Sequence, residues 1–241
     1  METISWVPLE SNPDMMNNLI DNLGVSSEWK FVDIYGFEED LLSFIPQPVL
    51  SVILLFPCGE IGSPDSQPEC DRKPDESGDS PKEMSATCKD ENAIYFMAQT
   101  IQNACGTIAI IHSVANVMDS ITFTENSSLK KFIEDTKGLT PLAKAEVLMN
   151  TAVISDTLHE IAQTGQTEAP DPTANTDCHF VALTHINGHL YELDGRKPGP
   201  INHGPSSPAT FLKDATRICQ AYLDKSPQSF KFSALALCKD V

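Results

Sequence analysis

Residues 178–195, CHFVALTHINGHLYELDG, predict a β-hairpin around which the rest of the fold can be arranged. Two largely apolar runs flank Asn187-Gly188, a dipeptide that favours the two-residue type I′ turn. A turn of this type pairs Ile186 with His189. That pairing sets the register, so it determines which residues of the two strands face each other.

The register predicts that a histidine and an aspartate approach each other. Counting outward from the turn pairs Val181 with Asp194, and His179 shares the face of Val181 because side chains alternate along a strand. Diagonal neighbours are roughly 7 to 8 Å apart at Cα, so the imidazole and the carboxylate can meet side chain to side chain. The sequence thus predicts a general base, His179, oriented by Asp194.

A cysteine at the start of a helix is the candidate nucleophile. Residues 99–116 read QTIQNACGTIAIIHSVAN, and Ile108, Ile111 and Ala115 recur at helical spacing after Cys105. A helix start offers unpaired N–H groups and a partial positive charge, and both favour the thiolate. A lone cysteine here is more often a small core residue, so the assignment depends on the whole set of residues.

Each residue type has a defined chemical task in a cysteine hydrolase. Cys105 is the nucleophile, His179 takes its proton or holds it as an ion pair, and Asp194 fixes the imidazole tautomer. Gln99 is the candidate donor to the oxyanion, a contribution typically of about 100- to 1000-fold in rate. The constellation predicts a thiol-dependent hydrolase.

At these residues the chain resembles the ubiquitin carboxyl-terminal hydrolase family, and most of all its short members without a C-terminal extension. All four positions hold the residue that the family uses, and the resemblance runs nearly end to end. The stretches that carry it are Trp6–Pro13, Asn103–Thr107, Gly165–Pro170, His189–Pro198 and Pro200–Gly204.

The resemblance implies an α/β, papain-like fold in one catalytic domain, residues 1–241. Its sheet is expected to be mostly antiparallel between helices, with the chain threaded through a knot. The resemblance also implies that a loop at about 160–176 crosses the active site and limits the leaving group. The expected reaction is hydrolysis at the C-terminal glycine of ubiquitin, releasing small or unfolded adducts and processing ubiquitin precursors.

Two other functions stay open at this point. The protein could chiefly hold monoubiquitin, with weak turnover, or it could act on a ubiquitin-like modifier such as Nedd8. No metal or organic cofactor is expected. Cys178 and His179 point to opposite faces of a strand, and no second cysteine lies near them at ligand spacing.

Composition limits the partners. The 241 residues carry a net charge of −18, from 34 acidic and 16 basic side chains. This argues against nucleic acid and anionic membranes, which bind lysine and arginine, and it suits a partner with a basic face. In the family this partner is ubiquitin, whose C-terminal tail carries arginines, so the resemblance implies that acidic residues near the cleft receive it.

Cysteine usage suggests a place inside the cell. Seven cysteines, an odd number without regular spacing, accompany an N-terminus that lacks a secretory signal. We expect a monomer in the cytoplasm, with the nucleus as a second compartment.

Composition also divides the chain. The apolar run 49–56 predicts a central buried strand, whereas residues 57–90 have almost no large apolar side chain and predict a disordered surface insert. A cap at Thr140 with Pro141 predicts a helix running to about Leu158. For His203 a role as a turn cap is favoured over a place in the cleft, because polar residues are common in turns.

Overall fold

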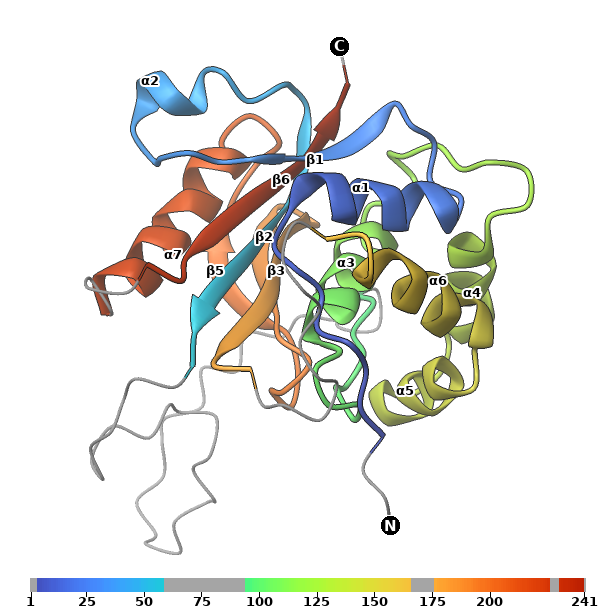
Figure 1. Ribbon diagram of the computed structural model, residues 1–241. Helices are drawn as coiled ribbons and strands as arrows, with labels where there is room; N and C mark the ends of the chain where they lie inside the picture. The colour runs from blue at the N-terminus through green and yellow to red at the C-terminus, as the bar shows by residue number, and fades with distance from the viewer. Residues whose placement is uncertain (1–3, 59–93, 166–175, 226–229, 241) are drawn as a thin grey trace, which may run out of the picture.

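A six-stranded sheet divides the molecule into two layers of helices (Figure 1). The computed structural model describes residues 4–58, 94–165, 176–225 and 230–240. The strands are ordered β1-β6-β2-β3-β4-β5, and every neighbouring pair is antiparallel. Their bounds are β1 Trp29–Asp33, β2 Val49–Pro57, β3 Cys178–Ile186, β4 His189–Leu193, β5 Ile201–Pro205 and β6 Ser233–Lys239.

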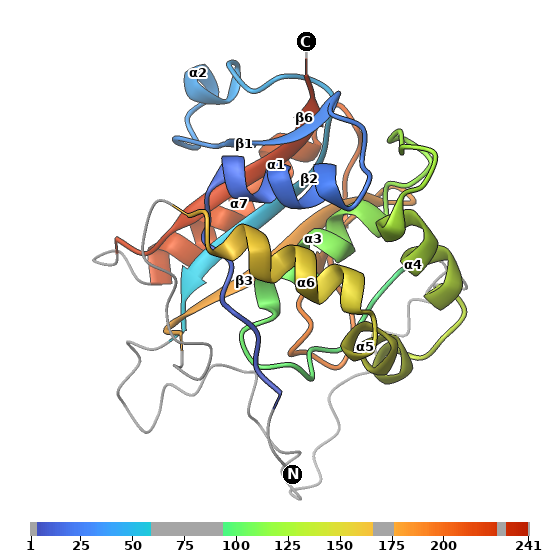
Figure 2. The same cartoon turned by 45° about the vertical axis from the view of Figure 1, so that its right-hand side comes forward.

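Helices cover both faces of this sheet (Figures 1 and 2). On one face lie α1 Pro13–Asn22, α3 Cys105–Ala115, α4 Ser128–Thr136, α5 Pro141–Met149 and α6 Ala152–Ala162. The other face carries α2 Glu39–Leu42 and α7 Phe211–Lys225, which form a second apolar core. These two layers confirm the predicted α/β class with an antiparallel sheet between helices.

Strand β2 is the central buried strand that the apolar run predicts. It lies between β6 and β3, and Val52, Ile53 and Leu54 are at most 1% exposed. Its neighbours are distant in sequence, because β3 begins at Cys178 and β6 at Ser233. Both halves of the chain thus contribute strands to one sheet.

The hairpin has the predicted register. Ile186 pairs with His189 at one end and Ala182 with Leu193 at the other. Asn187 and Gly188 both have positive φ, 50° and 82°, which is the signature of a type I′ turn.

The predicted single helix from Pro141 to about Leu158 is wrong, because the chain breaks into α5 and α6 at Asn150 and Thr151. The Asn150 side chain donates to the Glu146 carbonyl at 2.8 Å, and the Thr151 hydroxyl donates to the Val147 carbonyl at 2.7 Å. These side chains occupy carbonyls of the last turn and compete with continued helix.

The two predicted loops fall mainly outside the described residues. Pro57 is the last residue of β2, and positions 59–90 of the predicted insert are not described. Helix α6 takes the first residues of the stretch 160–176, and residues 166–175 lie outside the description. The knot stays a prediction, because it depends on the path between described segments. None of the described helices is both long and apolar enough to cross a membrane.

The turn makes a testable prediction about stability. Gly188→Ala should lower the free energy of unfolding by about 1 kcal/mol, because an L side chain is strained at its positive φ. Gly199→Ala is the matched control, since both positions have open space around a new Cβ and only Gly188 has positive φ. Urea unfolding measures both variants, and equal costs would contradict the type I′ assignment.

Candidate active site

His179 and Asp194 make the contact that the hairpin register predicts. The imidazole Nε2 lies 2.6 Å from Asp194 Oδ1, and the two side chains are only 3% and 2% exposed. The Arg196 N–H donates to the same carboxylate oxygen at 2.9 Å. Burial alone would raise the pKa of Asp194, but the bond to and charge of His179 outweigh it and hold this pKa below its usual value.

Cys105 is the first residue of α3 and is 6% exposed. Burial alone would raise the pKa of its thiol, but the interaction with His179, together with the Phe180 N–H and the Arg196 charge, lowers it overall. Burial alone would lower the pKa of the His179 imidazole, but the interactions with Asp194 and Cys105 outweigh it and raise this pKa. Both shifts favour a thiolate beside an imidazolium.

The geometry of the imidazole assigns its two nitrogens. Nε2 is engaged with Asp194, and Nδ1 is buried without a hydrogen bond of normal geometry in the described part of the chain. Nδ1 is therefore the nitrogen left to exchange a proton with the Cys105 thiol. This division leaves Asp194 to orient the ring.

A strained turn places Cys105 at its helix start. Asn103 has φ 63°, a conformation that asparagine tolerates better than most side chains. The residue before the helix, Ala104, makes no side-chain cap. A helix start of this kind leaves the backbone N–H groups of its first turn without partners inside the helix.

Gln99 is brought to this site through the turn that follows Asp194. Its N–H donates to the Gly195 carbonyl at 2.7 Å. A Cβ at Gly195 would lie 3.1 Å from Gln99 Cβ and 3.2 Å from Ile108 Cγ2, so only glycine fits without displacement. The Gln99 amide donates to the Ile101 carbonyl at 3.2 Å.

Sequence reasoning missed His112. This residue lies two turns after Cys105 on α3, is fully buried, and accepts a hydrogen bond from the Met97 N–H at 2.9 Å. Its ring stacks on Phe96 at 5.2 Å, and burial lowers the pKa of His112 to about 4, so the ring is neutral. It joins the segment leading to Gln99 to the helix of Cys105. A lone histidine among isoleucines is the signal that could have revealed it.

Arg196 was also missed, although it directly follows Asp194-Gly195. Besides its N–H bond to Asp194, its Nη1 lies 3.8 Å from Cys58 Sγ. Its positive charge favours the Cys105 thiolate.

The turn-cap interpretation of His203 is wrong. His203 lies on β5, and its Nε2 is 2.9 Å from Glu192 Oε2. As for metals, the described residues include no group of three or more His, Cys, Asp or Glu that could hold an ion.

A cysteine that opens a helix, followed in chain order by a histidine and an aspartate from an antiparallel sheet, defines a papain-like cysteine hydrolase. A model of the family "Ubiquitin carboxyl-terminal hydrolase, family 1" matches residues 6–224. The chain therefore belongs to this family of cysteine peptidases.

Relatives agree over nearly the whole chain. A probable ubiquitin carboxyl-terminal hydrolase of Dictyostelium discoideum is 41% identical over 98% of this chain and 88% of its own. Ubiquitin carboxyl-terminal hydrolase 3 of Arabidopsis thaliana is 40% identical, covering 97% and 94%. Human isozyme L1 is 39% identical, covering 96% and 97%.

A solved structure is similar in fold. The catalytic domain of Trichinella spiralis UCH37, solved bound to ubiquitin vinyl methyl ester, superposes with a TM-score of 0.72. The match covers 98% of this chain and 96% of that one at 20% identity. At this identity the likeness establishes the fold.

The thiolate can be tested without any substrate. Iodoacetamide should alkylate Cys105 with a pH midpoint below the ordinary thiol value of 9.0, and Asp194→Asn should raise that midpoint by destabilising the imidazolium. Peptide mass spectrometry separates the cysteines. At pH 7 Cys105 should react faster than the more exposed Cys58, because burial raises the pKa of Cys58 to about 11. Faster alkylation of Cys58 would contradict the ion pair.

Proposed function

We propose that this protein hydrolyses the bond between the C-terminal glycine of ubiquitin and small or unfolded adducts, and processes ubiquitin precursors. The observation that carries this proposal is the cysteine at the start of α3, in a member of this family whose His179 and Asp194 form a buried pair 2.6 Å apart.

The reaction follows from the placement of these groups. The Cys105 thiolate attacks the glycine carbonyl carbon, and the resulting oxyanion is held by N–H groups at the start of α3 and by the Gln99 amide. The His179 imidazolium gives its proton to the leaving amine as the C–N bond breaks. Neutral His179 then takes a proton from water as the water oxygen attacks the thioester carbon. The C–S bond breaks, which restores the Cys105 thiolate beside the His179 imidazolium, and the carboxylic acid product leaves and ionises.

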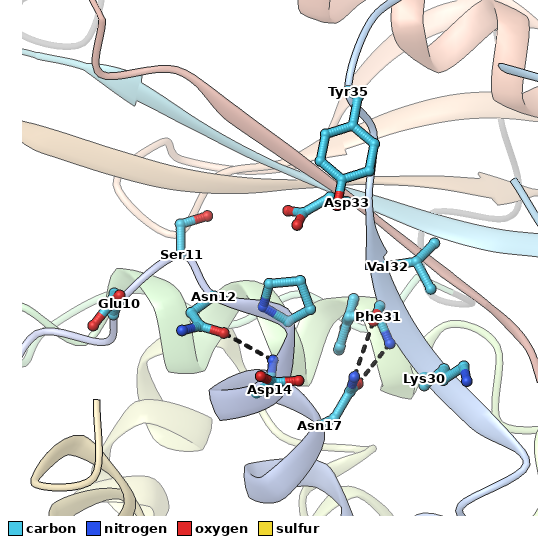
Figure 3. A pocket seen from close by; sticks show the side chains of 11 residues that line it. Glu10, Ser11, Asn12, Asp14, Asn17, Lys30, Phe31, Val32, Asp33 and Tyr35 are labelled. Carbon is cyan, nitrogen blue, oxygen red and sulfur yellow. Dashed lines mark hydrogen bonds between the residues drawn. The ribbon is translucent and has the colours of Figure 1, made fainter. Parts of the chain in front are cut away.

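We infer that a polar groove receives the ubiquitin tail (Figure 3). It has a volume of about 570 Å³ and lies between the N-terminal segment, α1 and β1. Among the described residues, the acids that line it are Glu10, Asp14 and Asp33. Lys30, a basic residue of the lining, points away in Figure 3 and pairs with Asp240 at 2.5 Å.

The groove is electrostatically suited to a cationic ligand. Burial, and to a smaller extent the charge of Asp14, raise the pKa of Asp33. A hydrogen bond from Tyr35 lowers it, but does not outweigh them. An arginine side chain would relieve both effects by pairing with the carboxylate. The groove begins close to the nucleophile. Glu10 lines the groove and follows Leu9, and a Cβ added at Gly106, the residue after Cys105, would lie only 3.0 Å from the Leu9 Cβ.

The preference for small adducts rests on the loop at 160–176. Gly165, the last described residue of its first part, lies against the groove: a Cβ there would be 2.8 Å from Glu10 Oε2. The loop therefore departs beside the tail groove, which supports the proposal that it limits the leaving group.

The proposal includes a monomeric protein in the cytoplasm and the nucleus that binds neither nucleic acid nor membranes. The net charge of −18 supports the part on nucleic acid and membranes, because both are polyanionic. Nedd8 is the competing modifier, and comparison of initial rates on the two proteins decides between them.

Removing charge from the groove should weaken substrate binding. Asp33→Asn should raise KM about fivefold with kcat nearly unchanged, since a partly exposed ion pair contributes up to about 1 kcal/mol. Initial rates on ubiquitin with a fluorogenic C-terminal amide measure this, and high salt should shrink the difference. Asp156→Asn, at an exposed site on α6, is the control and should behave as wild type. An unchanged KM in Asp33→Asn would contradict the groove assignment.

The catalytic assignment has its own test on the same substrate. Cys105→Ala should abolish turnover and keep ubiquitin binding, because the site's shape is retained. Gln99→Ala should lower kcat about 100- to 1000-fold with little change in affinity, because the amide acts on the oxyanion. Calorimetric titration measures binding. Tight binding with negligible turnover by the wild type would instead indicate a protein that holds monoubiquitin.

A further inference from the structure

Glu192 is a buried carboxylate close to the catalytic pair that the mechanism does not use. It lies on β4 two residues before Asp194 and is 1% exposed. Three side chains donate to it, from three different segments: Lys197, His203 and Tyr222. Burial alone would raise the pKa of Glu192, but these donors outweigh it and keep the group ionised at neutral pH.

One path from Glu192 leads to Asp194 through the turn that follows β4. Lys197 Nζ lies 2.8 Å from Glu192 Oε1, while the Lys197 N–H donates to the Asp194 carbonyl at 2.9 Å. The ion pair therefore closes the turn that contains Asp194. The same turn presents the Arg196 N–H to the Asp194 carboxylate.

A second path leads to the imidazole through two aromatic rings. The Tyr222 hydroxyl of α7 donates to Glu192 Oε1 at 2.9 Å, and its ring lies 4.5 Å from the ring of Phe56. Phe56 in turn meets His179 edge to face, with ring centroids 5.8 Å apart and an angle of 82°. The hydroxyl bond thus fixes the ring that supports the imidazole.

His203 completes the group from β5, with its Nε2 2.9 Å from Glu192 Oε2. A buried group of charges contributes little to the stability of a sheet, because the cost of removing the charges from water offsets much of their attraction. The effect of the Glu192 group is instead to fix geometry, since each donor holds its own segment in one position. The turn after β4 and helix α7, which orient the catalytic pair, thus both donate to the Glu192 carboxylate.

We propose that Glu192 is a positioning residue that holds Asp194 and His179 in their catalytic geometry through Lys197 and through Tyr222 and Phe56. Its effect on turnover rests on the proposed function. Its effect on Cys105 does not, because the imidazolium that Asp194 stabilises controls the thiolate in the free enzyme.

The central test is Glu192→Gln, which keeps the size of the side chain and removes its charge. On ubiquitin bearing the fluorogenic amide, kcat should fall about 10-fold with KM unchanged, because small displacements at a reacting centre lower the rate strongly. The pH midpoint of iodoacetamide alkylation at Cys105 should rise. The matched control is Glu134→Gln, which breaks an exposed ion pair with Lys130, 3.9 Å away, and should change neither quantity.

A double variant distinguishes positioning from general stabilisation. If Glu192 acts through the pair, Glu192→Gln should have little further effect on kcat in the Asp194→Asn background. Multiplicative losses, or a lower melting temperature with kcat and midpoint both unchanged, would overturn the proposal.

Two milder variants cover the case in which Glu192→Gln does not fold. Tyr222→Phe and Lys197→Met each remove one donor, and each should lower kcat and raise the alkylation midpoint by a smaller amount than Asp194→Asn does. If neither variant moves either quantity, the proposal is wrong. If the wild type does not turn over the ubiquitin substrate, only the proposed function is contradicted. The alkylation midpoint of Cys105 still tests the role of Glu192.

Discussion

The 2.6 Å contact between His179 and Asp194 is the constraint on which the site depends. It requires that β3 and β4 pair in one register, because a slip of one residue would move Asp194 to the opposite face. The turn after Asp194 must then reach the Gln99 segment, and Gly195 lets it do so. The contact also holds the pKa of His179 above its ordinary value, which in turn supports the Cys105 thiolate.

Such a contact is stable in a buried place only when the surrounding groups are arranged for it. Removing a carboxylate and an imidazolium from water is unfavourable, so each needs hydrogen-bond partners. The Arg196 N–H serves Asp194, and the ring of Phe56 shields His179. Glu192 lies next to this pair and accepts hydrogen bonds from three donors of its own. The active site is thus the inner part of a polar network set into the sheet.

Local rules predicted the hairpin, the helix start at Cys105 and the strand β2, because each depends on neighbouring residues. Asn187-Gly188 allows only a few turn geometries, and an eight-residue apolar run between polar stretches has few places other than a sheet centre. The same rules failed at Asn150 and Thr151, where two side chains compete with the helix. They failed at His203 too, because its partner Glu192 lies on another strand.

The sequence by itself determined the nucleophile's helix, the register of the hairpin and hence the meeting of His179 with Asp194, since these follow from short-range geometry. Membership of the family could likewise be recognised from the motifs. Only the tertiary structure decided how α3 and Gln99 reach that pair, which role Arg196 and His112 take, and which residues gather around Glu192. These contacts join segments far apart in the chain, and their formation depends on the burial of the whole sheet between its two helical layers.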